Sequence, residues 1–165
     1  MTATQTRRGV RKLPSPGELQ ACAARSLQHL QVIEATVSAV TSDCDMLRLL
    51  TRDLADIERS LMDRTPDVLL DPEGRVSSTL MVLEDIAERL HRRASTAYRA
   101  AVDDADLHDD DGVADAWEDC VTAAADLHGA AQSLRERVVL LDRLKSPRSG
   151  ATYASEEDLF AAMGL

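Results

Sequence analysis

Three side chains that could take part in catalysis lie close together in one predicted helical stretch: Asp126, His128 and Gln132. His128 and Gln132 are one helical turn apart and share a face, so they could present a group that orients a water molecule. Asp126 lies about 240° round the helix from Gln132 and does not share its face. Residues 122–131 are nearly all small, which predicts a shallow track suited to close docking. The alternative is an Ala-rich helix that packs tightly on its neighbours and leaves Asp126 and His128 solvated.

Two other stretches have spacings that metal sites use. Glu88-x-x-His91 has the spacing of di-iron bundles, but such sites need it twice, and none of the other His residues has an acid at that offset. Residues 107–118 match several acidic positions of a calcium-binding loop, but its first position is Leu107 instead of Asp. We therefore expect no metal site and no cofactor in this chain. We interpret residues 103–112 as an acidic turn whose carboxylates cap the helix that follows.

The first predicted helix starts at Ser15-Pro16-Gly17-Glu18, a capping box with Pro in the first turn. No Gly or Pro follows until Pro66. The apolar residues alternate spacings of three and four along Leu30, Ile33, Val37, Val40, Cys44 and Leu47. This seam favours one continuous helix of about 49 residues, about 70 Å long. Thr41, Ser42 and Asp43 could instead cap a break in it.

Two more long helices are predicted after a connector that ends in the turn Asp71-Pro72-Glu73-Gly74. The helix at about 76–105 has its apolar face at Leu80, Leu83, Ala87, Leu90, Ala94, Ala97 and Ala101. The helix at about 112–145 has its face at Val113, Trp117, Cys120, Ala124, Leu127, Ala131, Leu134, Val138 and Leu141. We therefore predict an all-α, elongated antiparallel bundle. A homodimer would complete four helices if the first helix is continuous, and one chain would supply all four if it breaks near Ser42.

Composition and charge narrow the function classes. Aromatic residues are 2% of the chain, so narrow helix-on-helix seams are expected instead of a sheet. The net charge of −10 argues against nucleic acid as the main partner. No apolar run is long enough for a membrane span, and the N-terminus lacks the apolar stretch of a signal peptide, so we expect a cytoplasmic protein. Cys22, Cys44 and Cys120 have no metal-site spacing and are interpreted as small core residues.

The segment 155–165, with the sequence SEEDLFAAMGL, has the pattern of a short docking helix. Ser155 and Asp158 form a capping box, and Leu159, Phe160 and Met163 fall on one face. Such a short helix is not stable alone in water, so we expect it to order in the apolar groove of a partner. The predicted organisation is a basic tail (1–14), a helical bundle (15–146), a linker (147–154) and this docking helix (155–165).

This terminal pattern resembles the C-terminal peptide of the CheZ family of chemotaxis phosphatases, which docks on the response regulator CheY. There too the peptide follows a linker from a long helical bundle. Carried over by position, the resemblance implies that the contacts to a CheY-like regulator are Asp158, Leu159, Phe160, Met163 and Leu165. The bundle of such a protein adds a group that holds water in line with the phosphorus, while the regulator brings its own Mg²⁺ and Lys.

The catalytic pattern of that family is D-L-x-G-Q, with an Asp and a Gln one turn apart on a bundle helix. The nearest match here is Asp126-Leu127-His128-Gly129-Ala130, in which Ala130 stands at the position of the catalytic Gln. The resemblance therefore implies a role for Asp126 but assigns no amide. Gln132, or His128 beside it, is the substitute that the sequence offers.

Three alternatives to a phosphatase remain open at this stage. The protein could be a non-catalytic adaptor that binds a regulator through the same peptide. It could be a coiled-coil scaffold with an unrelated docking tag. His128-Gly129-Ala130-Ala131 also resembles, less closely, the phosphoryl acceptor of histidine phosphotransfer domains, which normally place a Lys and a Gly at wider spacing after the His.

Overall fold

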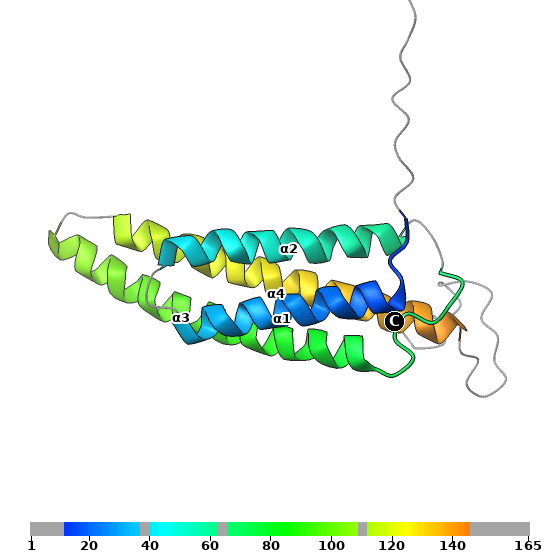
Figure 1. Cartoon of the computed structure of the whole chain (residues 1–165). Coiled ribbons are helices and arrows are strands. Elements are labelled where there is room, and N and C mark those ends of the chain that lie inside the picture. Colours follow the sequence, from blue (N-terminus) through cyan, green and yellow to red (C-terminus); the bar gives the residue numbers. More distant parts are fainter. Residues whose placement is uncertain (1–11, 37–39, 63–65, 109–111, 146–165) are drawn as a thin grey trace, which may run out of the picture.

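The computed structural model describes residues 12–36, 40–62, 66–108 and 112–145. These residues form four helices and no strand: α1 (Pro16–Thr36), α2 (Val40–Met62), α3 (Arg75–His108) and α4 (Gly112–Lys145). Figure 1 shows the four helices lying lengthwise beside one another in an elongated antiparallel bundle. The prediction of an all-α bundle is confirmed.

The prediction of one continuous first helix is wrong, and the alternative of a break is correct. The break lies between Thr36 and Val40, however, so residues 41–43 belong to α2 and do not cap it as the alternative supposed. The helix ends at Thr36, and α2 starts at Val40 and runs back antiparallel to α1 (Figure 1). Residues 36–43, TVSAVTSD, are rich in β-branched residues and in Ser, which have lower helix propensity than Ala or Leu. Folding back lets both halves of the seam pack within one chain. A second copy is therefore not needed to complete four helices, and homodimerisation stays a prediction.

The apolar seams of the four helices meet in one core. α3 and α4 form the most extensively packed pair, α2 packs on α4, and α1 packs on α3, whereas α1 and α2 contact each other less than any of these pairs do. The fully buried leucines come from all four helices and the α2–α3 connector: Leu19, Leu30, Leu47, Leu54, Leu61, Leu70, Leu80, Leu83, Leu90, Leu127, Leu134 and Leu141. Each such side chain contributes about 1.5 to 3 kcal/mol of burial free energy.

The predicted face of α4 is correct except at its first turn. Val113 is 57% exposed, and the neighbouring Ala114 is buried in its place. Trp117 is half-buried against the core. α3 and α4 have 34 residues each against 21 and 23 in α1 and α2, so the far end of the α3–α4 pair extends past the shorter helices (Figure 1). Val113 therefore has no third helix to cover it.

The start of α1 has the predicted capping box. The Glu18 backbone N–H donates to Ser15 Oγ at 3.2 Å, and the Ser15 N–H donates to Glu18 Oε2 at 2.7 Å. These bonds lower the pKa of the Glu18 carboxyl. At the other end of α1, Arg89 of α3 holds Glu34 with bonds of 2.7 and 3.2 Å, and Arg93 donates to the Glu34 carbonyl at 3.1 Å. Polar contacts thus fix both ends of α1.

None of the helices in the described ranges combines the length and the apolar character that crossing a bilayer requires.

Candidate functional site

α4 places the three predicted catalytic side chains on two sides of its axis. Leu127 is fully buried and points into the core, so Asp126 and His128 lie on its two flanks. Asp126 and Gln132 are exposed, and His128 is half-buried. The structure therefore brings His128 and Gln132 to one side and leaves Asp126 apart, as the helical spacing predicts.

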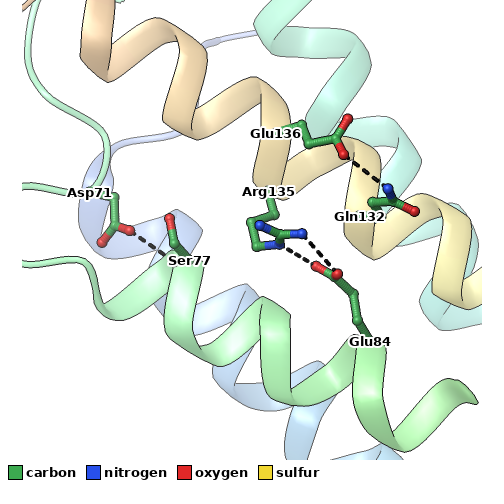
Figure 2. A network of polar contacts seen from close by, with 6 residues as sticks. All are labelled: Asp71, Ser77, Glu84, Gln132, Arg135 and Glu136. Carbon is green, nitrogen blue, oxygen red and sulfur yellow. Dashed lines mark hydrogen bonds and ion pairs between the residues drawn. The ribbon is translucent and has the colours of Figure 1, made fainter.

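The amide of Gln132 is held by a neighbour on its own helix. Gln132 Nε2 donates to Glu136 Oε1 at 2.9 Å, and Figure 2 shows both side chains on the outer side of α4. Because the nitrogen makes this bond, the amide oxygen can accept a hydrogen bond from an incoming group. Gln132 is thus an exposed amide with a preferred orientation.

The helix surface between Asp126 and Gln132 is open to solvent at Gly129. Gly129 is exposed, and a Cβ added there would meet no atom within 4 Å. Ala130, at the position where the family pattern has its Gln, is half-buried and packs against the core. A longer side chain at position 130 would therefore lie on the side of α4 that packs against the other helices. This described helix has no amide side chain at the position where the family pattern has its Gln.

His128 lies close enough to α3 for its charge to act on Glu88. Arg92 binds the Glu88 carboxylate at 2.5 Å and is the main reason that the pKa of Glu88 is lowered, with smaller contributions from His128 and His91. The negative charge of Glu88 would repel a phosphoryl group on His128. This setting does not favour the phosphotransfer alternative.

The two stretches whose spacings resemble metal sites do not form a metal-binding cluster among the described residues. Glu88 is bound by Arg92, and no three His, Cys, Asp or Glu residues of the described chain are arranged to hold a metal ion. Leu107 belongs to α3, whereas Gly112, Asp115 and Glu118 belong to α4. The described positions of the supposed calcium-binding loop are therefore divided between two helices, and residues 109–111 lie outside the described residues.

A partly buried ion pair beside the candidate site was not predicted from the sequence. Arg135 of α4 holds the carboxylate of Glu84 of α3 with bonds of 2.5 and 3.1 Å (Figure 2). Glu84 is 8% exposed, and its carboxylate raises the pKa of the Arg135 guanidinium. The sequence signal was an acid directly after Leu83 on the apolar face, but its partner is 51 residues away. This pair fixes how α3 and α4 are aligned under Gln132.

Comparisons with protein family models, with curated proteins and with solved structures found no match to this chain. Its function must therefore be argued from its own residues.

A groove elsewhere on the bundle does not contribute to the candidate site. It has a volume of about 420 Å³ and is open to solvent. Its walls come from the leader before α1 and from α1 and α2: Lys12, Leu13, Pro14, Glu18, Cys22, Arg25, Asp53, Asp56 and Ile57. No α4 residue lines it, so the candidate site is the outer surface of α4 and not a cavity.

The predicted partner-binding residues, Asp158, Leu159, Phe160, Met163 and Leu165, lie outside the described residues. The arginines of the basic tail also lie outside the described residues: Arg7, Arg8 and Arg11. Lys12 is described. The roles of these residues stay predictions.

Proposed function

We propose that this protein binds a CheY-like response regulator through its C-terminal peptide and promotes loss of the regulator's aspartyl phosphate. The observation that carries this proposal is the peptide pattern at 158–165 following a helical bundle that ends at Lys145. The bundle and the peptide are two separate contact elements on one chain. A single partner could engage both of them.

In this proposal, the C-terminal peptide binds the response regulator. Leu159, Phe160, Met163 and Leu165 would contribute about 1.5 to 3 kcal/mol each when buried in a groove. Ordering about eight residues costs on the order of 1 kcal/mol each, so the free peptide should bind with a Kd of tens of micromolar or weaker. The linker at 147–154 then raises the effective concentration of the regulator at the bundle.

The outer face of α4 supplies the second contact. In the proposed reaction a water oxygen attacks the phosphorus, the P–O bond to the regulator's aspartate breaks, and the carboxylate leaves. The regulator provides Mg²⁺ and a Lys, and the bundle provides an oriented acceptor for the water. Gln132 is suited to this role because it is exposed and Glu136 binds its nitrogen. Asp126, across the open surface at Gly129, would contact the regulator itself.

The test uses a receiver domain phosphorylated with a small phosphodonor, with phosphate release followed after the donor is removed. We expect the protein to accelerate release, Gln132→Ala to lose most of the acceleration, and Asp126→Ala to reduce it. Gln28→Ala is the matched control, because Gln28 is an exposed glutamine on α1. Equal rates for Gln132→Ala and the unmodified protein would exclude the role of Gln132.

A second candidate function is a non-catalytic adaptor, and the position of Ala130 favours it. No amide shares a face with Asp126 on α4, so the family's pairing of acid and amide is not reproduced. The adaptor predicts that the regulator binds with normal affinity while its phosphate is lost at the unassisted rate. The same assay therefore separates the two functions.

Capture is tested separately with a synthetic peptide of residues 153–165. We expect it to shift a defined set of signals in the NMR spectrum of a receiver domain, and Phe160→Ala to abolish the shifts. If every receiver tried is unaffected, the protein is a scaffold with an unrelated docking segment. Sedimentation of the 18.0 kDa chain tests the predicted homodimer in the same preparation.

A further inference from the structure

Two buried cysteines meet where α2 packs on α4. Cys44 and Cys120 are each 3% exposed. The Cys44 thiol lies 3.9 Å from the carbonyl oxygen of Ala116, which is one helical turn before Cys120. The two thiols are hydrogen-bond partners of each other, and both are in the reduced state. Two thiols from distant parts of the sequence are thus in contact.

An ion pair joins the two helices at the same level. Arg48, one turn after Cys44, binds Asp119, the residue before Cys120, at 2.9 Å. This exposed contact adds little stability by itself, and the packing of α2 on α4 keeps the two thiols opposite each other. The pair is therefore positioned before any bond forms between the sulfur atoms.

We propose that Cys44 and Cys120 form a redox site that closes to an intramolecular disulfide when the protein meets a peroxide. One thiol loses its proton and attacks a peroxide oxygen, so that an S–O bond forms and the O–O bond breaks; the departing hydroxide takes up the proton and leaves as water, giving a sulfenic acid. The second thiol loses its proton and attacks the sulfenic sulfur, so that the S–S bond forms and the S–O bond breaks; this hydroxide takes up the second proton and leaves as water. Two thiols are oxidised by two electrons in all, and one peroxide is reduced to two waters. A dithiol reverses the reaction by exchange.

The environment makes this reaction slow. Burial raises the pKa of both thiols, and the pKa of Cys120 is raised to about 12. The charged groups that act on the pair are Asp43 and Arg48 of α2 and Asp119 of α4. Because the thiolate is the attacking species, the reaction is expected to take hours at neutral pH and to accelerate when this end of the bundle opens.

The third cysteine provides a control inside the same chain. Cys22 lies on α1, and its side-chain hydrogen-bond partners are Ser26 and Arg25 instead of a thiol. Cys22 is buried as Cys44 and Cys120 are, so it controls for the oxidation of a buried thiol that has no second thiol beside it. Only the Cys44–Cys120 pair among the described cysteines has the arrangement that gives a disulfide within one chain.

The test treats the reduced full-length protein with hydrogen peroxide, in buffer and in mild urea, before alkylation and peptide mapping by mass spectrometry. We expect a cross-linked peptide that joins Cys44 to Cys120, with a mass loss of about 2 Da, in the unmodified protein and in Cys22→Ala. Cys44→Ala and Cys120→Ala should lack it. The link should raise the Tm by about 5 to 15 °C, and a dithiol should reverse this rise.

Three results would overturn the proposal: sulfinic acid at either cysteine without a cross-link, a disulfide between two chains, or unreacted thiols in both buffer and urea. The mapping uses the unmodified protein, so a variant that folds poorly does not weaken the test. The redox site is independent of the proposed function. It lies near the starts of α2 and α4, at the opposite end of the bundle from Lys145, where the C-terminal segment begins (Figure 1).

Discussion

Gln132 and Gly129 are the residues on which a role for α4 in catalysis depends. Gln132 supplies an amide that is exposed and held by Glu136. Gly129 supplies an open surface between this amide and Asp126. A glycine in a helix interior disfavours the helix, and no neighbouring side chain occupies the space that a Cβ would fill. Packing inside this bundle therefore does not require Gly129, whereas close approach of a partner would.

Gly129→Ala should stabilise the protein and weaken its effect on a receiver domain. The added Cβ meets nothing within 4 Å, so the gain is expected at about 0.5 to 1 kcal/mol from helix propensity. Urea unfolding measures the gain, and the phosphate-release assay measures the loss. Gly17→Ala on α1 has equally open space and serves as the control that leaves the receiver unaffected. Full activity of Gly129→Ala would show that no partner approaches closely there.

Arg135→Met should destabilise the bundle by about 2 to 3 kcal/mol, because it leaves the Glu84 carboxylate buried without a partner. Glu84→Leu combined with Arg135→Met should recover most of this loss. Arg92→Met is the matched control, since its ion pair with Glu88 is exposed and should be worth less than about 0.5 kcal/mol. Urea denaturation of the four proteins gives the comparison, and equal effects of the two Arg substitutions would contradict it.

The Cys120 thiol should make stability fall at high pH. Its pKa is about 12 in the folded protein and about 8.5 in an unfolded chain. A raised folded pKa gives stability that is complete below the unfolded pKa and is lost as the pH rises from there towards the folded pKa. Between pH 8 and 10, the unmodified reduced protein should lose about 1 to 2 kcal/mol more than Cys120→Ala. Urea unfolding at a series of pH values tests this, and parallel curves would contradict it.

Among the elements, the start of α3 is organised by two aspartates, one from the α2–α3 connector and one from α4. Asp71 caps α3 by accepting the backbone N–H groups of Val76 and Ser77 at 2.9 and 2.8 Å. Gly74, with φ of 69°, makes the turn that brings Asp71 to this position. Asp142 of α4 in turn accepts the N–H groups of Leu70 and Asp71, both at 2.7 Å. The α2–α3 connector is thereby fixed to the end of α4.

Asp142→Ala should cost about 2 kcal/mol, because two partly buried N–H groups lose their acceptor. Asp142→Asn should cost less, since its single amide oxygen can still accept one of them. Asp126→Asn, an exposed aspartate on the same helix, should change stability by less than about 0.5 kcal/mol. Thermal unfolding followed by the fluorescence of Trp117, the only Trp, ranks the three variants. An unchanged Tm for Asp142→Ala would mean that the connector does not depend on its hydrogen bonds to Asp142.

For the whole molecule, the described core is complete within α1 to α4 and the α2–α3 connector. The buried apolar residues run from Leu19 to Leu141, and every helix contributes to one cluster. Arg137 of α4 also donates to the Leu61 carbonyl at 3.2 Å, which anchors the end of α2. The bundle therefore has its own source of stability, separate from the proposed docking peptide.

A chain that ends at Lys145 should keep its fold and lose its partner. We expect its helicity and Tm to change little, by less than about 3 °C, since no described core residue is removed. Binding to a receiver domain should fall at least tenfold, because the four apolar anchors are deleted. Circular dichroism and calorimetric titration measure the two effects. Retained binding would place the receiver contact on the bundle instead of the peptide.

The amino-acid sequence by itself determined the helical class, the capping box at Ser15, the turn at Asp71–Gly74 and most of the apolar faces. Each of these depends on residues within one or two turns, so local spacing was sufficient. It also determined that Asp126 and Gln132 occupy different faces of one helix, since this follows from their separation of six residues. The docking peptide is likewise a local pattern, and its role stays a prediction.

Only the tertiary structure decided where the first seam folds back and which distant side chains meet. A seam with spacings of three and four is equally compatible with one long helix and with a hairpin, because both bury the same face. More than fifty residues separate the two partners in each of three contacts: Glu84 with Arg135, the connector with Asp142, and Cys44 with Cys120. Their contacts depend on the alignment of whole helices, which is set by packing summed over the entire core and not by any short stretch of the chain.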